Sequence, residues 1–242
     1  MDGSGPAGEA VMMQSIGTIR SSFPDRFGIP RQPGLIPAAR ARVELLPELG
    51  SDVVRGLEAF SHVWVVFLFH QVDRWKPLVR PPRLGGTAKR GVFATRSPYR
   101  PNRIGLSLVK LLAVERDPVV IYVEGGDFVD GTPLLDLKPY LPYAEARPDA
   151  RADWAQDAPA ALPVDMSPEL ESQLLAYEEE HPRLRALAEQ VLAADPRPAY
   201  AAARTGRYVV RVGPVDLRFS VDGGRVALLE VIDIAGRARR DP

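Results

Sequence analysis

The feature that most constrains the fold is a succession of short strand patterns, separated by glycine- and proline-rich turns, between residues 14 and 147. The clearest is His62–His70, which is β-branched or aromatic almost throughout, so both of its faces are expected to be covered. Further strands are expected at 15–22, 41–46, 90–95, 104–115, 119–124 and 134–137. A short helix is expected at 51–60, with Gly56 at the end of its regular part. Many strands at short spacing predict a sandwich or a barrel.

The composition changes after Ala144, where a stretch rich in alanine, aspartate and proline begins. Ser167 followed by Pro168 is a good helix start, and this helix is expected to reach about Glu180, with a second over 182–194. The stretches 208–221 and 225–233 alternate around Asp222-Gly223-Gly224, which predicts a hairpin. We therefore expect a leader (1–13), a barrel domain (14–147), a linker (148–166) and a small α+β domain (167–242).

Composition excludes several kinds of site. Cysteine is absent, which excludes disulfides, thiolate metal ligands and a cysteine nucleophile. With three histidines and no cysteine, we expect no metal site. The longest apolar stretch, Val63–Phe69, is too short to span a bilayer, so no membrane partner is expected. The cytoplasm is the expected compartment.

Charge is distributed unevenly along a chain whose formal net charge is zero. Residues 74–114 carry ten basic residues and no acidic one, a pattern that suits phosphate groups. The alternative is a solvated surface whose ion partners lie elsewhere in the sequence. Polar or strained segments adjoin the apolar strands at 27–34, 70–71, 89–102 and 127–143, where binding residues are expected to gather.

These segments carry motifs that resemble the TrmO family, also called TsaA-like or YaeB-like, over residues 14–147. The motifs are Gly28-Ile29-Pro30-Arg31-Gln32, Gly56-Leu57-Glu58-Ala59-Phe60-Ser61-His62, Arg80-Pro81-Pro82-Arg83-Leu84-Gly85-Gly86, the run from Gly91 to Asn102, Asp130-Gly131-Thr132-Pro133, and the run from Leu135 to Pro142. Asp195-Pro196-Arg197-Pro198-Ala199-Tyr200 resembles the accessory domain of the longer members. Two departures are Arg103, where the family usually has proline, and Gly125-Gly126, where a more apolar stretch is common.

The resemblance implies a mainly β fold with an N-terminal barrel that binds S-adenosylmethionine (SAM). It also implies a homodimer and an enzyme that methylates N6 of N6-threonylcarbamoyladenosine, next to the anticodon of threonine tRNA. Two other functions stay open on the sequence alone. One is a barrel that senses SAM or a nucleotide without catalysis, and the other is an RNA-binding barrel without a cofactor.

By resemblance, the cofactor-binding residues are expected to come from five segments. They are Pro30, Arg31, Gln32, His70, Gln71, Arg96, Leu106, Asp127, Phe128, Val129 and Asp130. His70 either bonds to the cofactor or is a satisfied core histidine, and the 127–130 loop either contacts SAM or forms a capped turn. Arg96 faces either the carboxylate of SAM or an anionic group of the substrate.

RNA contacts are expected from a second group of residues. They are Tyr99, Arg100, Asn102, Lys138 and Tyr140. Tyr99 either stacks on an unpaired base or packs within the protein. Because the acceptor nitrogen is ureido-like and weakly nucleophilic, a nearby group that accepts its proton would help, and Asp130 is the candidate by elimination.

Overall fold

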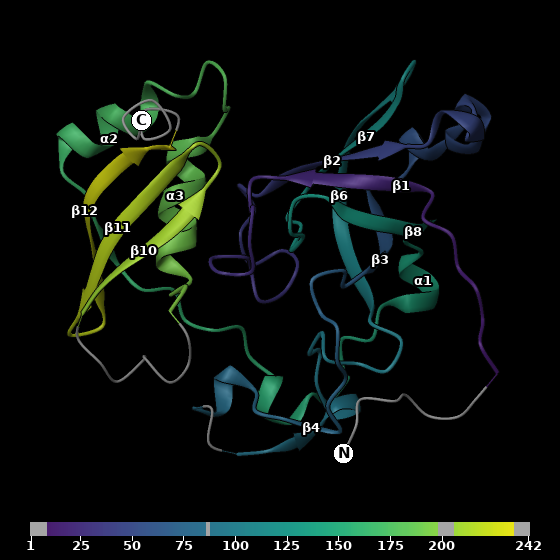
Figure 1. The fold of residues 1–242 in the computed structure, drawn as a ribbon, viewed down its shortest axis with the longest axis horizontal. Helices are drawn as coiled ribbons and strands as arrows, with labels where there is room; N and C mark the ends of the chain where they lie inside the picture. Colours follow the sequence, from purple (N-terminus) through teal and green to yellow (C-terminus); the bar gives the residue numbers. More distant parts are fainter. Residues whose placement is uncertain (1–8, 86–87, 198–205, 235–242) are drawn as a thin grey trace.

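Six strands of the first half close into an antiparallel barrel, in the order β1-β2-β7-β6-β3-β8 (Figure 1). Their bounds are β1 (Gly17–Ser21), β2 (Arg40–Leu45), β3 (His62–Leu68), β6 (Ile104–Arg116), β7 (Val119–Glu124) and β8 (Thr132–Pro139). The computed structural model describes residues 9–85, 88–197 and 206–234, so the first eight residues of the expected leader lie outside the described part. Of the two architectures that the strand pattern allowed, the chain adopts the barrel.

Alternation along β3 shows how the sequence fills the barrel. Val63, Val65 and Phe67 point inward and are at most 3% exposed, as parts of one apolar cluster that spans all six strands. The residues between them, such as Trp64, are half-buried on the outer face, which is therefore less covered than the sequence suggested. The pleat places alternate residues on opposite faces, so the inward set forms the core.

Two predicted elements of the barrel domain differ in the structure. The expected helix at 51–60 is a pair of 3-10 turns, η2 (Ser51–Val54) and η3 (Leu57–Ala59), because Gly56 adopts a left-handed φ of 85° between them. The expected strand at 90–95 ends after β5 (Arg90–Gly91), which pairs with β4 (Leu78–Val79), and continues as the 3-10 turn η5 (Val92–Ala94). The remaining short elements are η1 (Pro47–Leu49), η4 (Pro82–Leu84), α1 (Pro142–Glu145) and η6 (Asp153–Ala155).

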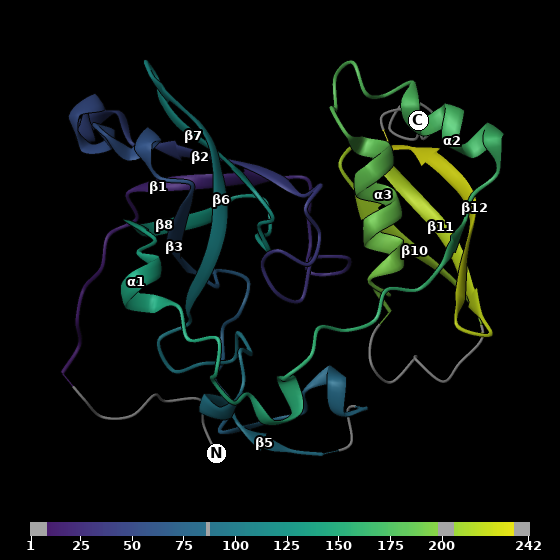
Figure 2. The ribbon, with the colours of Figure 1, turned by 180° about the vertical axis from the view of Figure 1, so that it is seen from behind.

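The second half forms a four-stranded sheet with two helices over one face (Figures 1 and 2). The elements are β9 (Val164–Asp165), α2 (Pro168–Leu175), α3 (Leu184–Ala193), β10 (Gly206–Val212), β11 (Val215–Asp222) and β12 (Arg225–Asp233). The expected N-cap is present, since the Ser167 side chain accepts a hydrogen bond from the Leu170 amide. No helix of the described residues has the length and apolar character that crossing a membrane requires.

The strand pattern of this half contains more elements than the sequence indicated. The expected single strand at 208–221 is two strands, because Gly213 turns the chain with a φ of 54° between β10 and β11. The expected linker contributes β9, which pairs in parallel with β12 through Val164 and Val226. The linker is therefore partly built into the C-terminal sheet.

One hydrophobic cluster joins the two halves of the chain. The connection between β1 and β2 leaves the barrel and extends toward the C-terminal sheet (Figure 1). Phe23, Ile36, Ala38 and Ala39 from this connection are at most 3% exposed and belong to the same cluster as α3 and β10–β12. The C-terminal core is therefore completed by residues that precede it by more than a hundred positions.

We expect Phe23→Ala to destabilise both halves together. Truncating a fully buried phenylalanine costs about 3–5 kcal/mol, and this one joins the two halves. Guanidinium denaturation followed by circular dichroism should give one transition, shifted to lower denaturant. The matched control is Phe93→Ala, whose side chain is 76% exposed and whose loss should cost less than about 0.5 kcal/mol. Two separate transitions, with only one of them shifted, would contradict a shared core.

Candidate active site

A cleft of about 1140 Å³ lies where the barrel, the β4–β5 hairpin and the C-terminal domain meet. Its walls come from the β1–β2 connection, the end of β3, the loop before β6, the loop before β8, and the end of α3 with the turn after it. Nine of the eleven residues expected to bind the cofactor line this cleft: Pro30, Arg31, Gln32, His70, Gln71, Arg96, Leu106, Asp127 and Val129. Tyr99 and Arg100 also line it.

Asp127 is the carboxylate on the barrel side of this cleft. Its Oδ1 accepts a hydrogen bond of 2.5 Å from Oγ of Ser107, whose side chain points into the barrel and is 1% exposed. Burial raises the pKa of Asp127 to about 6, against the opposing effects of the Ser107 hydrogen bond and the Arg96 charge. A carboxylate with this pKa exchanges a proton near neutral pH.

Arg96 lies beside this carboxylate and links it to the β1–β2 connection. Its Nη1 donates to Oε1 of Gln32 at 2.5 Å, and its Nη2 lies 3.4 Å from the carbonyl oxygen of Leu106. The Leu106 side chain is 48% exposed on the edge of the cleft. Three of the sequence-predicted segments thus meet around one guanidinium group.

The other predicted arginines are held by backbone carbonyls. Nη1 of Arg100 donates to the carbonyl oxygens of Val92 at 3.3 Å and Thr95 at 2.8 Å, and the guanidinium lies 5.5 Å from the centre of the Phe93 ring. These contacts fold the loop that carries Arg96. Nζ of Lys76 lies over the Tyr99 ring, 4.4 Å from its centroid. This contact favours packing of Tyr99 within the protein over stacking on an RNA base.

Arg103, which replaces the usual proline, has a local structural role. Its φ is 52°, a value that the proline ring does not allow. Its Nη1 donates to the carbonyl oxygen of Val72 at 2.6 Å, so its charge is directed to the backbone. The neighbouring Asn102 is exposed and lies outside the cleft lining.

Besides Asn102, four predicted site residues lie outside the cleft lining. Phe128 is 1% exposed in the barrel core. Asp130 is outside the cleft lining, where its Oδ1 accepts from the Ser21 amide at 2.9 Å and its Oδ2 lies 3.9 Å from Arg20. These contacts tie the loop before β8 to the end of β1.

Lys138 and Tyr140 lie near the start of β3, at the opposite end from His70. Lys138 pairs with Trp64 in the sheet, and the Tyr140 amide donates to the carbonyl of His62 at 3.0 Å. The Tyr140 ring packs edge-on against Trp64, with 6.2 Å between centroids. Their contact with RNA stays a prediction.

Sequence reasoning missed the residues that the C-terminal domain places in the cleft. Gln190 on α3 and the turn from Asp195 to Arg197 line one wall. The sequence gives no local signal for these residues, because their partners lie far away along the chain: Gln190 accepts a hydrogen bond from Ala38, 152 positions before it. Ser107 was also missed, although a hydroxyl within an apolar alternating strand indicates a buried polar contact.

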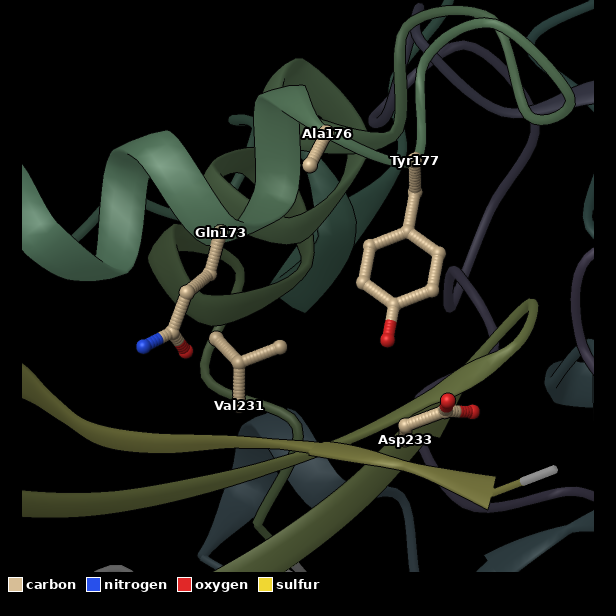
Figure 3. Close-up of a pocket in the computed structure, with 5 residues that line it drawn as sticks. All are labelled: Gln173, Ala176, Tyr177, Val231 and Asp233. Atoms are coloured by element: carbon tan, nitrogen blue, oxygen red, sulfur yellow. The ribbon is translucent and has the colours of Figure 1, made fainter. Parts of the chain in front are cut away.

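A smaller hollow of about 330 Å³ lies between α2 and β12 (Figure 3). It is lined by Gln173, Ala176, Tyr177, Val231 and Asp233. The Tyr177 hydroxyl is directed toward the strand that carries Asp233 (Figure 3), and burial followed by the Asp233 charge raises the tyrosine pKa. None of the sequence-predicted site residues lies here. Within the described ranges, no group of three or more His, Asp and Glu residues could hold a metal ion.

We expect Asp127→Asn to stabilise the protein above pH 6. A folded-state pKa raised from 3.8 to about 6 gives stability that is fully present below pH 3.8 and is lost as the pH rises to about 6. The asparagine has no such loss and can still accept from Ser107. The free energies of unfolding of the two proteins, measured by denaturant titration, should therefore differ little at pH 4. By pH 7 the variant should be more stable by about 2–3 kcal/mol. A difference that stays constant across this range would indicate an ordinary carboxylate.

Comparisons with known proteins match both halves of the chain. The model of the tRNA-methyltransferase O N-terminal domain matches residues 18–146, and that of the TrmO C-terminal domain matches residues 159–234. The tRNA (adenine(37)-N6)-methyltransferase of Escherichia coli is 52% identical over 197 residues, which cover 79% of this chain and 84% of that protein. A Pseudomonas aeruginosa relative, whose name describes an S-adenosylmethionine-dependent methyltransferase, is 47% identical over 91% of this chain and 96% of its own length.

Solved structures give the same result for the fold. The crystal structure of TrmO from Pseudomonas aeruginosa superposes with a TM-score of 0.79 and 38% identity, covering 94% of this chain and 99% of that one. The resemblance drawn from the loop motifs is thus confirmed over both domains. The chain belongs to the tRNA-methyltransferase O family.

Proposed function

We propose that this chain transfers a methyl group from SAM to N6 of N6-threonylcarbamoyladenosine, next to the anticodon of threonine tRNA. Membership of a SAM-dependent tRNA methyltransferase family supports the class of reaction, and the E. coli relative is named for N6 of adenine 37. The observation that carries the proposal is the cleft itself, in which a half-buried carboxylate and a guanidinium adjoin a strongly basic wall.

The chemistry of the lining fits SAM. The guanidinium of Arg96 suits the carboxylate of its amino-acid end, and main-chain groups beside Leu106 and Val129 suit the edge of adenine. His70 and Gln71, at the end of β3, offer further hydrogen-bonding groups. When bound, the cofactor supplies an electrophilic methyl group on a sulfonium.

The size of the cleft supports a second ligand. Small-molecule sites usually enclose roughly 300–1,000 Å³, and this one reaches about 1140 Å³. Methyl transfer by displacement requires the acceptor nitrogen in line with the methyl group and close to it. A cleft with room for both ligands allows this alignment.

The charge of the cleft supports RNA as the second ligand. Eight basic and two acidic residues line it: Arg26, Arg31, Lys76, Arg80, Lys89, Arg96, Arg100 and Arg197, against Asp127 and Asp195. Such an excess attracts a phosphate backbone and gives salt-sensitive binding. The exposed Phe93 ring beside Arg100 offers a face for an unpaired base.

For the proton acceptor, the structure favours Asp127 over Asp130. Asp127 lines the cleft and has a pKa near 6, which suits a base that works close to neutral pH. Ser107 donates a hydrogen bond to Oδ1 of this carboxylate and so fixes its position at the cleft. Asp130 instead caps the Ser21 amide outside the lining.

Two further parts of the proposal concern assembly and location. Leu78, Ile104 and Leu106 lie at the cleft with 37–53% of their surfaces exposed, which supports the expected homodimer because a second chain would cover them. We keep the cytoplasm as the proposed compartment, in line with a tRNA substrate and a chain without cysteine.

We expect Asp127→Asn to bind SAM with nearly unchanged affinity while turnover falls by a factor of roughly 10²–10⁴, the usual contribution of a positioned base. Isothermal titration calorimetry and single-turnover methylation measure the two quantities. Asp130→Asn is the matched control and should keep its turnover. Loss of SAM binding in Asp127→Asn would make this carboxylate a cofactor ligand, and loss of turnover in Asp130→Asn alone would return the role to Asp130.

The function is tested by incubating the protein with labelled SAM and threonine tRNA, with and without the threonylcarbamoyl group. Label should enter only the modified tRNA, and nucleoside mass spectrometry should find the extra methyl on the threonylcarbamoyladenosine. SAM binding without any transfer would favour a sensing barrel. Salt-sensitive tRNA binding without a SAM-induced gain in melting temperature would favour an RNA-binding barrel.

A further inference from the structure

The segment that carries Pro30–Gln32 is held at both ends by the C-terminal domain. At its start, the Gly213 amide donates to the carbonyl oxygen of Ser22 at 2.8 Å. At its end, the Ala38 amide donates to Oε1 of Gln190 on α3, also at 2.8 Å. Both bonds join residues of different domains, so the conformation between them depends on where α3 and β10 lie.

The middle of the segment is fastened through Arg31. Its Nη2 donates to the carbonyl oxygens of Asp195 at 3.2 Å and Arg197 at 3.0 Å. This side chain was expected to contact the cofactor, and the structure directs its guanidinium to the turn after α3. Packing is tight here as well, because a Cβ added at Gly28, whose φ is 90°, would lie 2.3 Å from Val210.

An ion pair gives the turn after α3 its shape. Oδ1 of Asp195 accepts from Nε of Arg197 at 2.7 Å, and Oδ2 accepts from Nη2 at 2.8 Å. The Arg197 side chain is 6% exposed, and Asp195 has a positive φ of 49°. Two parallel charge-assisted bonds to a buried guanidinium form a rigid unit. The unit presents two backbone carbonyls to Arg31.

The held segment leads directly to the centre of the cleft. Gln32 follows Arg31 and accepts from Arg96, which in turn lowers the pKa of the Asp127 carboxylate by its charge. A shift of the segment would therefore move Gln32 away from Arg96.

We propose that the C-terminal domain sets the affinity of the methyl-donor site, with Gln190 and the Asp195–Arg197 ion pair as positioning residues for the segment 30–32. The inference rests on the proposed function, because it assumes that SAM occupies this cleft. It assigns to the accessory domain a task at the cofactor, in addition to any contact with RNA. Gln190 acts through the Ala38 amide and is not a catalytic residue.

The first test is Gln190→Ala in the full chain, with Gln173→Ala as its matched control. Gln173 is on α2 and faces the hollow at β12, outside the cleft. We expect Gln190→Ala to weaken SAM binding five- to tenfold in calorimetry. Its kcat at saturating SAM should stay within twofold of wild type, and its melting temperature within about 2 °C. Gln173→Ala should leave the SAM Kd unchanged.

The second variant, Asp195→Asn, breaks the ion pair without forcing the backbone, because asparagine tolerates a positive φ. It should weaken SAM binding by at least as much as Gln190→Ala. Wild-type SAM affinity in both folded variants would overturn the inference, as would a lower melting temperature with an unchanged Kd. The wild-type chain in the same assays reports on the proposed function separately. If it neither binds SAM nor methylates tRNA, the function and the inference fail together, whereas normal wild-type activity with unaffected variants refutes the inference alone.

Discussion

The structure depends on the burial of one barrel connection in the core of another domain. Phe23, Ile36 and Ala38 leave the β-barrel and become part of the apolar cluster under α3. Hydrophobic burial has no direction, so the polar contacts around it fix the register: a glutamine to an amide at one end and an arginine to two carbonyls in the middle. This combination shapes one wall of the cleft and brings residues of both domains into it.

Electrostatics in the cleft follow from this arrangement. Basic side chains from the β1–β2 connection, the β4–β5 region and the loop before β6 line the same cleft as Asp127, the carboxylate that the barrel contributes. Burial in the barrel wall raises its pKa, while the neighbouring Arg96 opposes the rise, so that the group titrates close to neutral pH. An excess of cations around the cleft suits an anionic polymer as substrate, and a carboxylate that titrates near neutral pH suits removal of a proton.

The sequence predicted the parts whose signals are local. The period of two in β3, the proline and glycine turns and the Ser167 cap led to the barrel strands and the start of α2. It failed at Gly213, because a strand pattern on both sides of a glycine can continue or turn. At Gly56 the break was expected, but the segments on either side are 3-10 turns and not a helix. In the site, loop motifs placed most of the lining. Gln190 could not be predicted, since its partner is set by tertiary packing. Ser107 carried a local signal as a hydroxyl within an apolar strand, but its partner Asp127 is likewise set by packing.

The shared core also bears on how such a protein can be rearranged in evolution. The match to the N-terminal family model ends at residue 146 and the match to the C-terminal one begins at residue 159. In sequence, the stretch between them is the natural point for exchanging one C-terminal domain for another. In the folded protein, however, the C-terminal domain also includes part of the β1–β2 connection, which precedes that stretch by more than a hundred residues. The core of a C-terminal domain from another protein would not be shaped to pack against Phe23 and Ile36. Domain exchanges that persist in evolution should therefore keep the β1–β2 connection together with the C-terminal domain into which it packs.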